Sequence, residues 1–170
     1  MFIKRKRALD REEFYKYDKL NLGCGAFKKE GLINIDSSVF TEPDLVHDLN
    51  IIPYPFENES FNLIEVDHAL EHLDAPFAVM KELHRILKKE GQIVIRVPHF
   101  SRGFSHPGHS RGFDVTFPLY FREDLKLGYC GVSLKLKSMK LKWFAQLYLK
   151  KITLPAYQYI FGLILGWIFS

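Results

Sequence analysis

Two glycines and a carboxylate near the N-terminus are the residues best suited to bind a ligand. The sequence LNLGCG at residues 20–25 places a glycine turn directly after an apolar run. Glycine has no Cβ, so the backbone can turn sharply and approach a ligand closely. Asp36 ends the next apolar run, where its carboxylate can accept hydrogen bonds from both hydroxyls of a ribose. The pair predicts a site for a nucleoside-like ligand; an ordinary tight turn and a helix cap are the alternatives.

The segment between the glycine turn and Asp36 distinguishes two classes of ligand. Dinucleotide-binding sites use three glycines and a helix N-terminus to hold a pyrophosphate. The turn LNLGCG has two glycines, and the connecting sequence AFKKEGLINI is too short for a helix followed by a strand. A cofactor without phosphate therefore fits better, and the first helix of the fold is expected to be reduced or missing.

Short apolar runs alternate with turns, which predicts an α/β fold of the Rossmann-like, doubly wound type with a mostly parallel sheet. The runs before the first clear helix lie at residues 19–22, 32–36, 44–48 and 61–67. The carboxyl ends of parallel strands meet along one edge, where ligands of such sheets bind. Asn21, Asp36, Asp48 and Asp67 are expected to share that edge.

A helix is predicted over residues 75–90, with Asp74 as N-cap and Pro76 in the first turn. Gly91 follows its end, and residues 92–97 form the next strand. The side chains predicted to cover the sheet are Phe77, Met80, Leu83, His84 and Leu87.

The C-terminal half is less regular. Residues 98–118 lack periodicity and are predicted to form a substrate loop. Apolar residues alternate over 132–143 but change parity near Ser138, which predicts a bulge or tight turn. A seventh strand is not evident after Trp143, so the C-terminal strand is expected to be missing, with the apolar tail taking its space.

The 170 residues, 47% of them hydrophobic, predict one globular domain rather than a disordered chain. We divide the chain into a basic N-terminal extension (1–18), a domain (19–145) and an apolar tail (146–170). The two cysteines are too few for a disulfide framework, and no signal peptide is visible, which favours the cytoplasm. Both ends are basic around an acidic centre, which argues against a DNA-binding groove at the site.

The end of the tail, residues 152–170, carries no charged side chain. This composition leaves three interpretations open. The tail packs on the domain or on a partner, contacts the inner face of the membrane peripherally, or crosses the membrane. The same apolar tail makes a homodimer contact plausible.

Five motifs follow one another over residues 19–100: LNLGCG, GLINIDSS, HDLN, PYPFENESFNLIEVDHALEHL and ELHRILKKEGQIVIRVPHF. In this order they resemble class I S-adenosylmethionine-dependent methyltransferases, and the resemblance is closest to the type-11-like bacterial and archaeal enzymes. The resemblance implies S-adenosyl-L-methionine as cofactor. The cofactor-binding residues that it implies are Asn21, Leu22, Gly23, Cys24, Gly25, Asp36, Ser37, Asp48, Leu49, Asp67 and His68. An acidic residue is common in the family where Asn21 stands here.

The expected reaction is direct attack of an acceptor oxygen or nitrogen on the sulfonium methyl group, with a small-molecule, glycan or lipid-linked acceptor. His106 or His109 is the candidate general base, and Arg102 or Arg111 the candidate acceptor-binding residue. No metal is predicted, because no carboxylate or cysteine completes a histidine ligand set at a recognisable spacing. An inactive protein of the same fold that binds the cofactor or a partner, and an RNA methyltransferase, are the alternatives.

Overall fold

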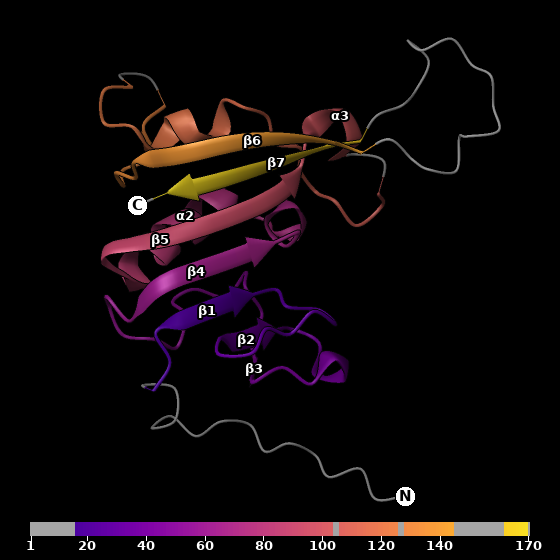
Figure 1. Cartoon of the computed structure of the whole chain (residues 1–170), viewed down its shortest axis with the longest axis vertical. Coiled ribbons are helices and arrows are strands. Elements are labelled where there is room, and N and C mark those ends of the chain that lie inside the picture. Colours follow the sequence, from indigo (N-terminus) through magenta and orange to yellow (C-terminus); the bar gives the residue numbers. More distant parts are fainter. Residues whose placement is uncertain (1–15, 104–105, 126–127, 145–161, 170) are drawn as a thin grey trace, which may run out of the picture.

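The computed structural model describes residues 16–103, 106–125, 128–144 and 162–169. Its centre is a seven-stranded sheet of order β3-β2-β1-β4-β5-β7-β6 (Figure 1). The strands are β1 (Lys19–Leu22), β2 (Ile33–Asp36), β3 (Leu45–Val46), β4 (Phe61–Asp67), β5 (Leu87–Pro98), β6 (Leu136–Phe144) and β7 (Gly162–Phe169).

The first five strands pair in parallel, whereas β7 is antiparallel to both β5 and β6. β7 therefore runs against the other six. Chain order reverses direction across the sheet between β1 and β4, and ligands of open α/β sheets bind at such a switch point. The predicted Rossmann-like, mostly parallel sheet is confirmed.

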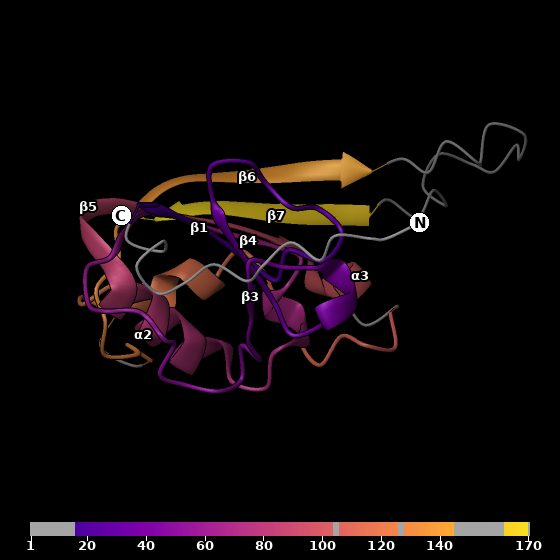
Figure 2. The ribbon, with the colours of Figure 1, turned by 90° about the horizontal axis from the view of Figure 1, so that it is seen from below.

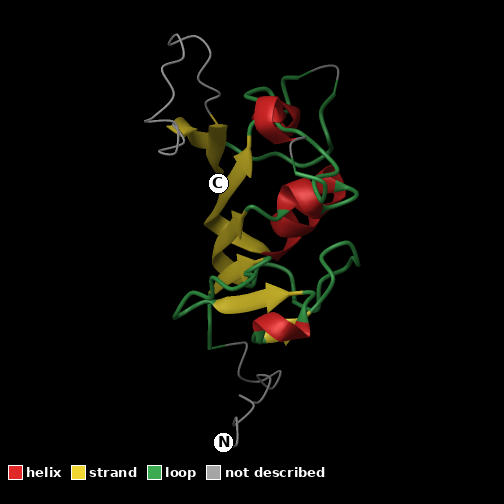
Figure 3. Ribbon diagram, turned by 90° about the vertical axis from the view of Figure 1, so that its right-hand side faces the viewer, coloured by secondary structure: helices red, strands yellow, loops and turns green. Residues whose placement is uncertain are grey.

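The helices α2 (Pro76–Ile86) and α3 (Phe100–Gly103) lie on the same face of the sheet (Figures 2 and 3). The 3₁₀ turns are η1 (Val39–Thr41), η2 (Leu70–His72) and η3 (Phe117–Phe121). Side chains of α2 and of the central strands form the core; those with 2% exposure or less include Leu20, Ile33, Ile35, Ile64, Val66, Val79, Met80, Leu83, Ile86, Ile93, Ile95 and Val97.

The predicted helix over 75–90 exists, but it is shorter. It begins after Ala75, with no side-chain cap, so the prediction of Asp74 as N-cap was wrong. It ends at Ile86 because Leu87 pairs with Phe61 as the first residue of β5. Its buried face is also rotated from the prediction: Val79 and Ile86 are buried, while Phe77 is 38% exposed and His84 is exposed.

No helix connects β1 to β2, as predicted. The side chain of Asn34 organises this connection instead. Its Oδ1 accepts from the Lys29 backbone N–H (2.8 Å) and from Asn21 Nδ2 (3.0 Å), and its Nδ2 donates to the carbonyls of Lys29 and Leu32 and to Asp44. A buried amide thus holds the loop that a helix would otherwise fix.

The C-terminal prediction was wrong in one respect and correct in another. Residues 162–169 of the predicted tail form β7 between β5 and β6, so the C-terminal strand is present. The register shift that we expect near Ser138 is confirmed between Leu136 and Ser138. Residues 1–15 and 145–161, which hold most of the predicted extension and part of the tail, lie outside the described residues. Within the described part of the chain, no helix is long and apolar enough to cross a bilayer.

Candidate functional site

The glycine turn follows β1 with both glycines in the left-handed region, at φ +65° for Gly23 and +49° for Gly25. A Cβ on Gly23 would lie 2.4 Å from the Cβ of Ala69, so the turn packs tightly against the segment after β4. A Cβ on Gly25 would meet no atom within 4 Å. The first glycine is therefore required by packing, and the second borders open space.

The Asp36 carboxylate lies directly against this turn. Gly25 donates its backbone N–H to Asp36 Oδ2 (2.8 Å), and Ser38 donates its backbone N–H to Oδ1 (2.9 Å). The Cys24 N–H also bonds the Ile35 carbonyl (2.9 Å), which ties the turn to β2. The predicted meeting of Asp36 with the turn is confirmed, because β1 and β2 are parallel neighbours that end side by side.

Three of the predicted cofactor residues are buried beneath the turn. Asn21, Leu22 and Cys24 are 1%, 1% and 4% exposed, and Asn21 Nδ2 donates to the Phe27 carbonyl (3.2 Å) as well as to Asn34. Burial and the nearby carboxylate of Asp36 raise the pKa of the Cys24 thiol to about 11. These side chains shape the turn, and the Cys24 thiol is protonated at neutral pH.

The residues predicted beside the ribose and the adenine lie on the loops after β2 and β3. Ser37 is exposed, and the hydrogen bond to Asp36 comes from its neighbour Ser38. Asp48 is exposed and accepts from the Asn50 N–H (2.9 Å), which stabilises the turn after β3. Leu49 is 6% exposed and would lie 3.8 Å from a Cβ on Gly23, so it supports the glycine turn from below.

At the end of β4, Asp67 belongs to an ion-pair network. Its carboxylate accepts from Arg96 (2.8 Å) and from Lys29 Nζ (2.9 Å), and Lys29 also pairs with Glu65. Burial opposes ionisation of Asp67, but these hydrogen bonds outweigh it and lower its pKa. Ile64 and Val66 alternate with Glu65 and Asp67 along β4, so the network lies on the sheet face opposite the core side of β4.

His68 follows at φ +51°, with Nδ1 3.2 Å from Glu71 Oε1. That hydrogen bond raises the pKa of the imidazole. The strand-end position predicts that Asp67 and His68 border the site. The partners of Asp67 were missed, because Lys29 comes from the connection between β1 and β2 and Arg96 from β5, both far from Asp67 in the sequence. Glu71 was missed although it lies only three residues after His68.

The predicted substrate loop is fastened to η2. Ser110 donates its N–H (3.0 Å) and its hydroxyl (3.2 Å) to the Glu71 carbonyl, and Arg111 Nη2 donates to the Asp74 carbonyl (2.7 Å). Arg111 therefore has a structural contact besides its predicted role. The side chain of Arg102 lies outside the described residues.

The two candidate bases lie together with a third histidine. The ring centroids of His106 and His109 are 4.6 Å apart, and His109 is 4.7 Å from His72. His72 Nδ1 lies 2.8 Å from the Gly108 carbonyl. The fold brings the fully buried carboxylate of Glu71 close to His72 and His109, a grouping that no recognisable ligand spacing in the sequence indicates.

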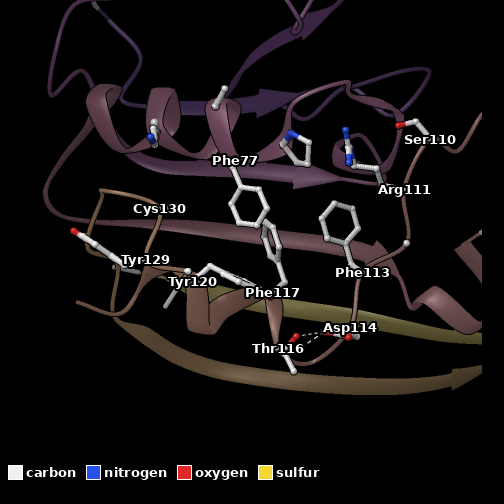
Figure 4. Close-up of a pocket in the computed structure, with 15 residues that line it drawn as sticks. Phe77, Ser110, Arg111, Phe113, Asp114, Thr116, Phe117, Tyr120, Tyr129 and Cys130 are labelled. Atoms are coloured by element: carbon white, nitrogen blue, oxygen red, sulfur yellow. Dashed lines mark hydrogen bonds between the residues drawn. The ribbon is translucent and has the colours of Figure 1, made fainter. Parts of the chain in front are cut away.

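A cavity of about 910 Å³ lies between α2, residues 110–116 and η3 (Figure 4). Its aromatic wall centres on Phe117, whose ring lies 5.2 Å from Phe77 and 4.8 Å from Phe113. Arg111 and Lys81 also line it. The cavity is built from α2 and the predicted substrate loop rather than from the glycine turn.

Residues 30–95 match the family described as a methyltransferase domain. This match covers less than half of the chain, from the connection between β1 and β2 to β5. That part of the chain is similar to methyltransferase domains. No curated protein matches the sequence.

Solved structures share the methyltransferase fold across most of the chain. An S-adenosylmethionine-dependent methyltransferase from Archaeoglobus fulgidus has a TM-score of 0.63 at 17% identity, over 92% of this chain and 87% of that one. A protein from Bacillus halodurans described as a methyltransferase has a TM-score of 0.62 at 16% identity, over 89% and 90%. A Haloferax volcanii protein described as a methyltransferase in complex with the activator Trm112 has a TM-score of 0.57 at 19% identity, over 89% and 81%. Identities at this level show the shared fold.

Proposed function

We propose that the protein transfers a methyl group from S-adenosyl-L-methionine to an oxygen or nitrogen of a small-molecule, glycan or lipid-linked acceptor. The observation that carries the proposal is the Asp36 carboxylate on the Gly25 N–H, 2.8 Å away, in a domain of the methyltransferase family. The connection from β1 to β2 contains no helix that could hold a pyrophosphate, which favours a phosphate-free nucleoside cofactor.

The residues at the strand ends fit the parts of this cofactor. Open space at Gly25 leaves room for the methionine chain of the cofactor against the backbone, and Asp36 provides acceptor oxygens for the ribose hydroxyls. Ser37 and Asp48, which are predicted beside the ribose and the adenine, are exposed to solvent. The cofactor supplies a methyl group already activated on a sulfonium, so the protein chiefly has to position the acceptor and exclude water.

The acceptor side is assigned to the loop at residues 106–117 and the cavity beside it. Aromatic rings and the two cations, Lys81 and Arg111, suit an acceptor with a flat or apolar part and an anionic group. Attack of the acceptor lone pair breaks the carbon–sulfur bond, the electron pair stays on sulfur, and a hydroxyl acceptor loses its proton. His106 or His109 is the candidate base for that proton.

The test is calorimetry with S-adenosylmethionine on two matched pairs. Asp36→Ala should weaken binding at least tenfold, since the loss of a charged acceptor costs about 1.5–3 kcal/mol; Asp74→Ala, at an exposed carboxylate, should leave it unchanged. Gly25→Ala should weaken binding more than Gly31→Ala, because both glycines have positive φ and open space but only Gly25 lies in the turn. Equal affinities within each pair would remove the turn from the site.

Transfer of labelled methyl groups to a panel of acceptors then separates an enzyme from an inactive relative. Cofactor binding without any transfer across glycan, lipid-linked and small-molecule acceptors would favour the inactive reading. Peripheral membrane contact remains a proposal as well, supported by the uncharged sequence at residues 152–161, since residues 162–169 form β7 inside the sheet. Co-sedimentation of the full chain with anionic liposomes tests it, and protein left in the supernatant would refute it.

A further inference from the structure

Glu71 has an unusual position for a carboxylate. Its side chain is fully buried, and its Oε2 is a buried polar atom without a hydrogen-bond partner. Leaving a buried acceptor unsatisfied is unfavourable, and more so for a charged group. Oε1 faces His68 Nδ1, 3.2 Å away, so Oε2 is the oxygen that lacks a counterpart.

Two histidines lie close to the carboxylate of Glu71. A carboxylate oxygen of Glu71, a ring nitrogen of His72 and a ring nitrogen of His109 all lie within 4.8 Å of one another. His72 is exposed and His109 half-buried, so the cluster has a buried end at Glu71 and an end open to solvent. An ion from solvent can enter the cluster at its exposed end and bind the carboxylate at the buried end.

The hydrogen bonds of Gly108 determine which rings can act as ligands. Its carbonyl only accepts, so His72 Nδ1 must donate, and the neutral ring then keeps a lone pair on Nε2. A backbone carbonyl that fixes the tautomer in this way is the usual support of a metal-binding histidine. The Gly108 N–H donates to His106 Nδ1 (3.1 Å), so the proton of the neutral His106 ring is on Nε2, and this ring is not a ligand.

We propose that Glu71, His72 and His109 bind a divalent transition-metal ion, with Zn²⁺ as the best match. Two imidazoles and one carboxylate are a set that zinc uses in sites that keep a fourth position open. Ligand atoms around tetrahedral zinc lie about 3.3 Å apart for bonds of roughly 2.0–2.1 Å, so the side chains close by up to about 1.5 Å. The exposed ring of His72 can make most of that movement.

The ion would join two segments that lie far apart in the sequence. Glu71 and His72 belong to η2, and His109 precedes Ser110 and Arg111, which line the cavity. Metal binding would therefore stabilise the wall of the cavity by fixing the loop on η2. This inference does not depend on the cofactor assignment, because none of its ligands lies in the glycine turn. It does exclude His109 as the general base, because the lone pair that binds the ion cannot also accept a proton.

The experiment uses the full, untagged chain after chelation, titrated with Zn²⁺ by calorimetry and with Co²⁺ by visible absorption. The wild type should bind one ion, with a rise in melting temperature, since a ligand of the folded state stabilises it. Glu71→Gln and His109→Asn should each weaken Zn²⁺ binding at least tenfold and abolish the shift, whereas His84→Asn, at an exposed histidine of α2, should retain both.

His109→Asn alters a half-buried position, so it keeps the test valid if Glu71→Gln fails to fold. Absence of binding to the wild type would overturn the proposal, as would variants that bind Zn²⁺ as the wild type does, since the ion would then lie on scattered surface histidines. S-adenosylmethionine calorimetry on the same samples separates failure of the metal site from failure of the proposed function.

Discussion

Replacement of Gly23 by alanine tests the tightest backbone approach of the candidate site. Two separate costs follow from the structure. A φ of +65° disfavours any residue with a Cβ by about 1–2 kcal/mol. The new Cβ would also lie 2.4 Å from the Ala69 Cβ, and such overpacking costs about 1–3 kcal/mol. Gly23→Ala should therefore lower the free energy of unfolding by about 2–5 kcal/mol.

Two further variants separate these costs. Gly31→Ala has a similar φ of +77° and open space around its Cβ, so it should show only the conformational cost of about 1–2 kcal/mol. Ala69→Gly removes the atom with which the new Cβ collides. In the double variant the overpacking should disappear, which gives a favourable coupling energy of about 1–3 kcal/mol in the mutant cycle.

Urea unfolding of the four cycle members and of Gly31→Ala provides the measurement. Equal costs for Gly23→Ala and Gly31→Ala, with no coupling to Ala69→Gly, would mean that the turn does not pack against the segment after β4. The reasoning about the site would then lose its geometric basis, because Ala69 immediately follows the predicted cofactor residue His68.

Three further predictions concern titratable and buried groups. Iodoacetamide at pH 8 should modify Cys130 well before Cys24, because burial raises the pKa of the Cys24 thiol to about 11; mass spectrometry showing equal rates would contradict this. The pKa of Asp67 is lowered in the folded state. Its ionised carboxylate therefore adds about 1 kcal/mol to the free energy of unfolding above its ordinary pKa, and this stabilisation is lost as the pH falls through the lowered pKa. Asp67→Asn should accordingly flatten the acid side of the stability profile, and an unchanged slope would count against the network. Glu82→Gln should cost about 2–4 kcal/mol in urea unfolding, because the buried carboxylate accepts from the Tyr54 N–H (2.7 Å) and pairs with Arg85; a loss below 0.5 kcal/mol, roughly the effect of a surface substitution, would contradict it.

The strand ends could be predicted because each depends on local sequence. Apolar runs that stop at Asp36 and Asp67 mark strands of a parallel sheet, and parallel strands bring their ends to one edge whatever lies between them. The parity change near Ser138 is equally local, since a strand can keep its apolar side chains on one face only by inserting a residue.

The last strand could not be predicted in this way. The sequence of β7, GLILGWIF, is an uninterrupted apolar run, which fits a strand buried on both faces as well as a buried helix or a membrane contact. Its position between β5 and β6 depends on pairing with strands earlier in the chain. The end of α2 also depends on pairing with an earlier strand. Helix propensity continues past Ile86, but the helix ends there because Leu87 pairs with Phe61 of β4.

The histidine cluster shows why side-chain sites require the three-dimensional fold. His72 and His109 belong to segments that the sequence treats as unrelated, and they meet because Ser110 hydrogen-bonds the Glu71 carbonyl. Hydroxyl-to-backbone bonds of this kind leave no pattern in the residues. The prediction of no metal relied on recognisable ligand spacings. Glu71 and His72 are adjacent in the chain, whereas His109 comes from the distant loop, so no spacing in the sequence indicated that the three lie together.

Asn34 explains how the domain keeps its cofactor edge without a helix between β1 and β2. A helix at this point would fix the glycine turn through its own backbone hydrogen bonds and would add a positive N-terminal dipole suited to phosphate. The buried Asn34 amide instead satisfies the backbone of Lys29 and Leu32 and reaches Asn21 beneath the turn. The turn is thus held without a helix dipole, next to the carboxylate of Asp36. The negative charge beside an open turn is unfavourable for a pyrophosphate and suits the cationic sulfonium nucleoside that we propose.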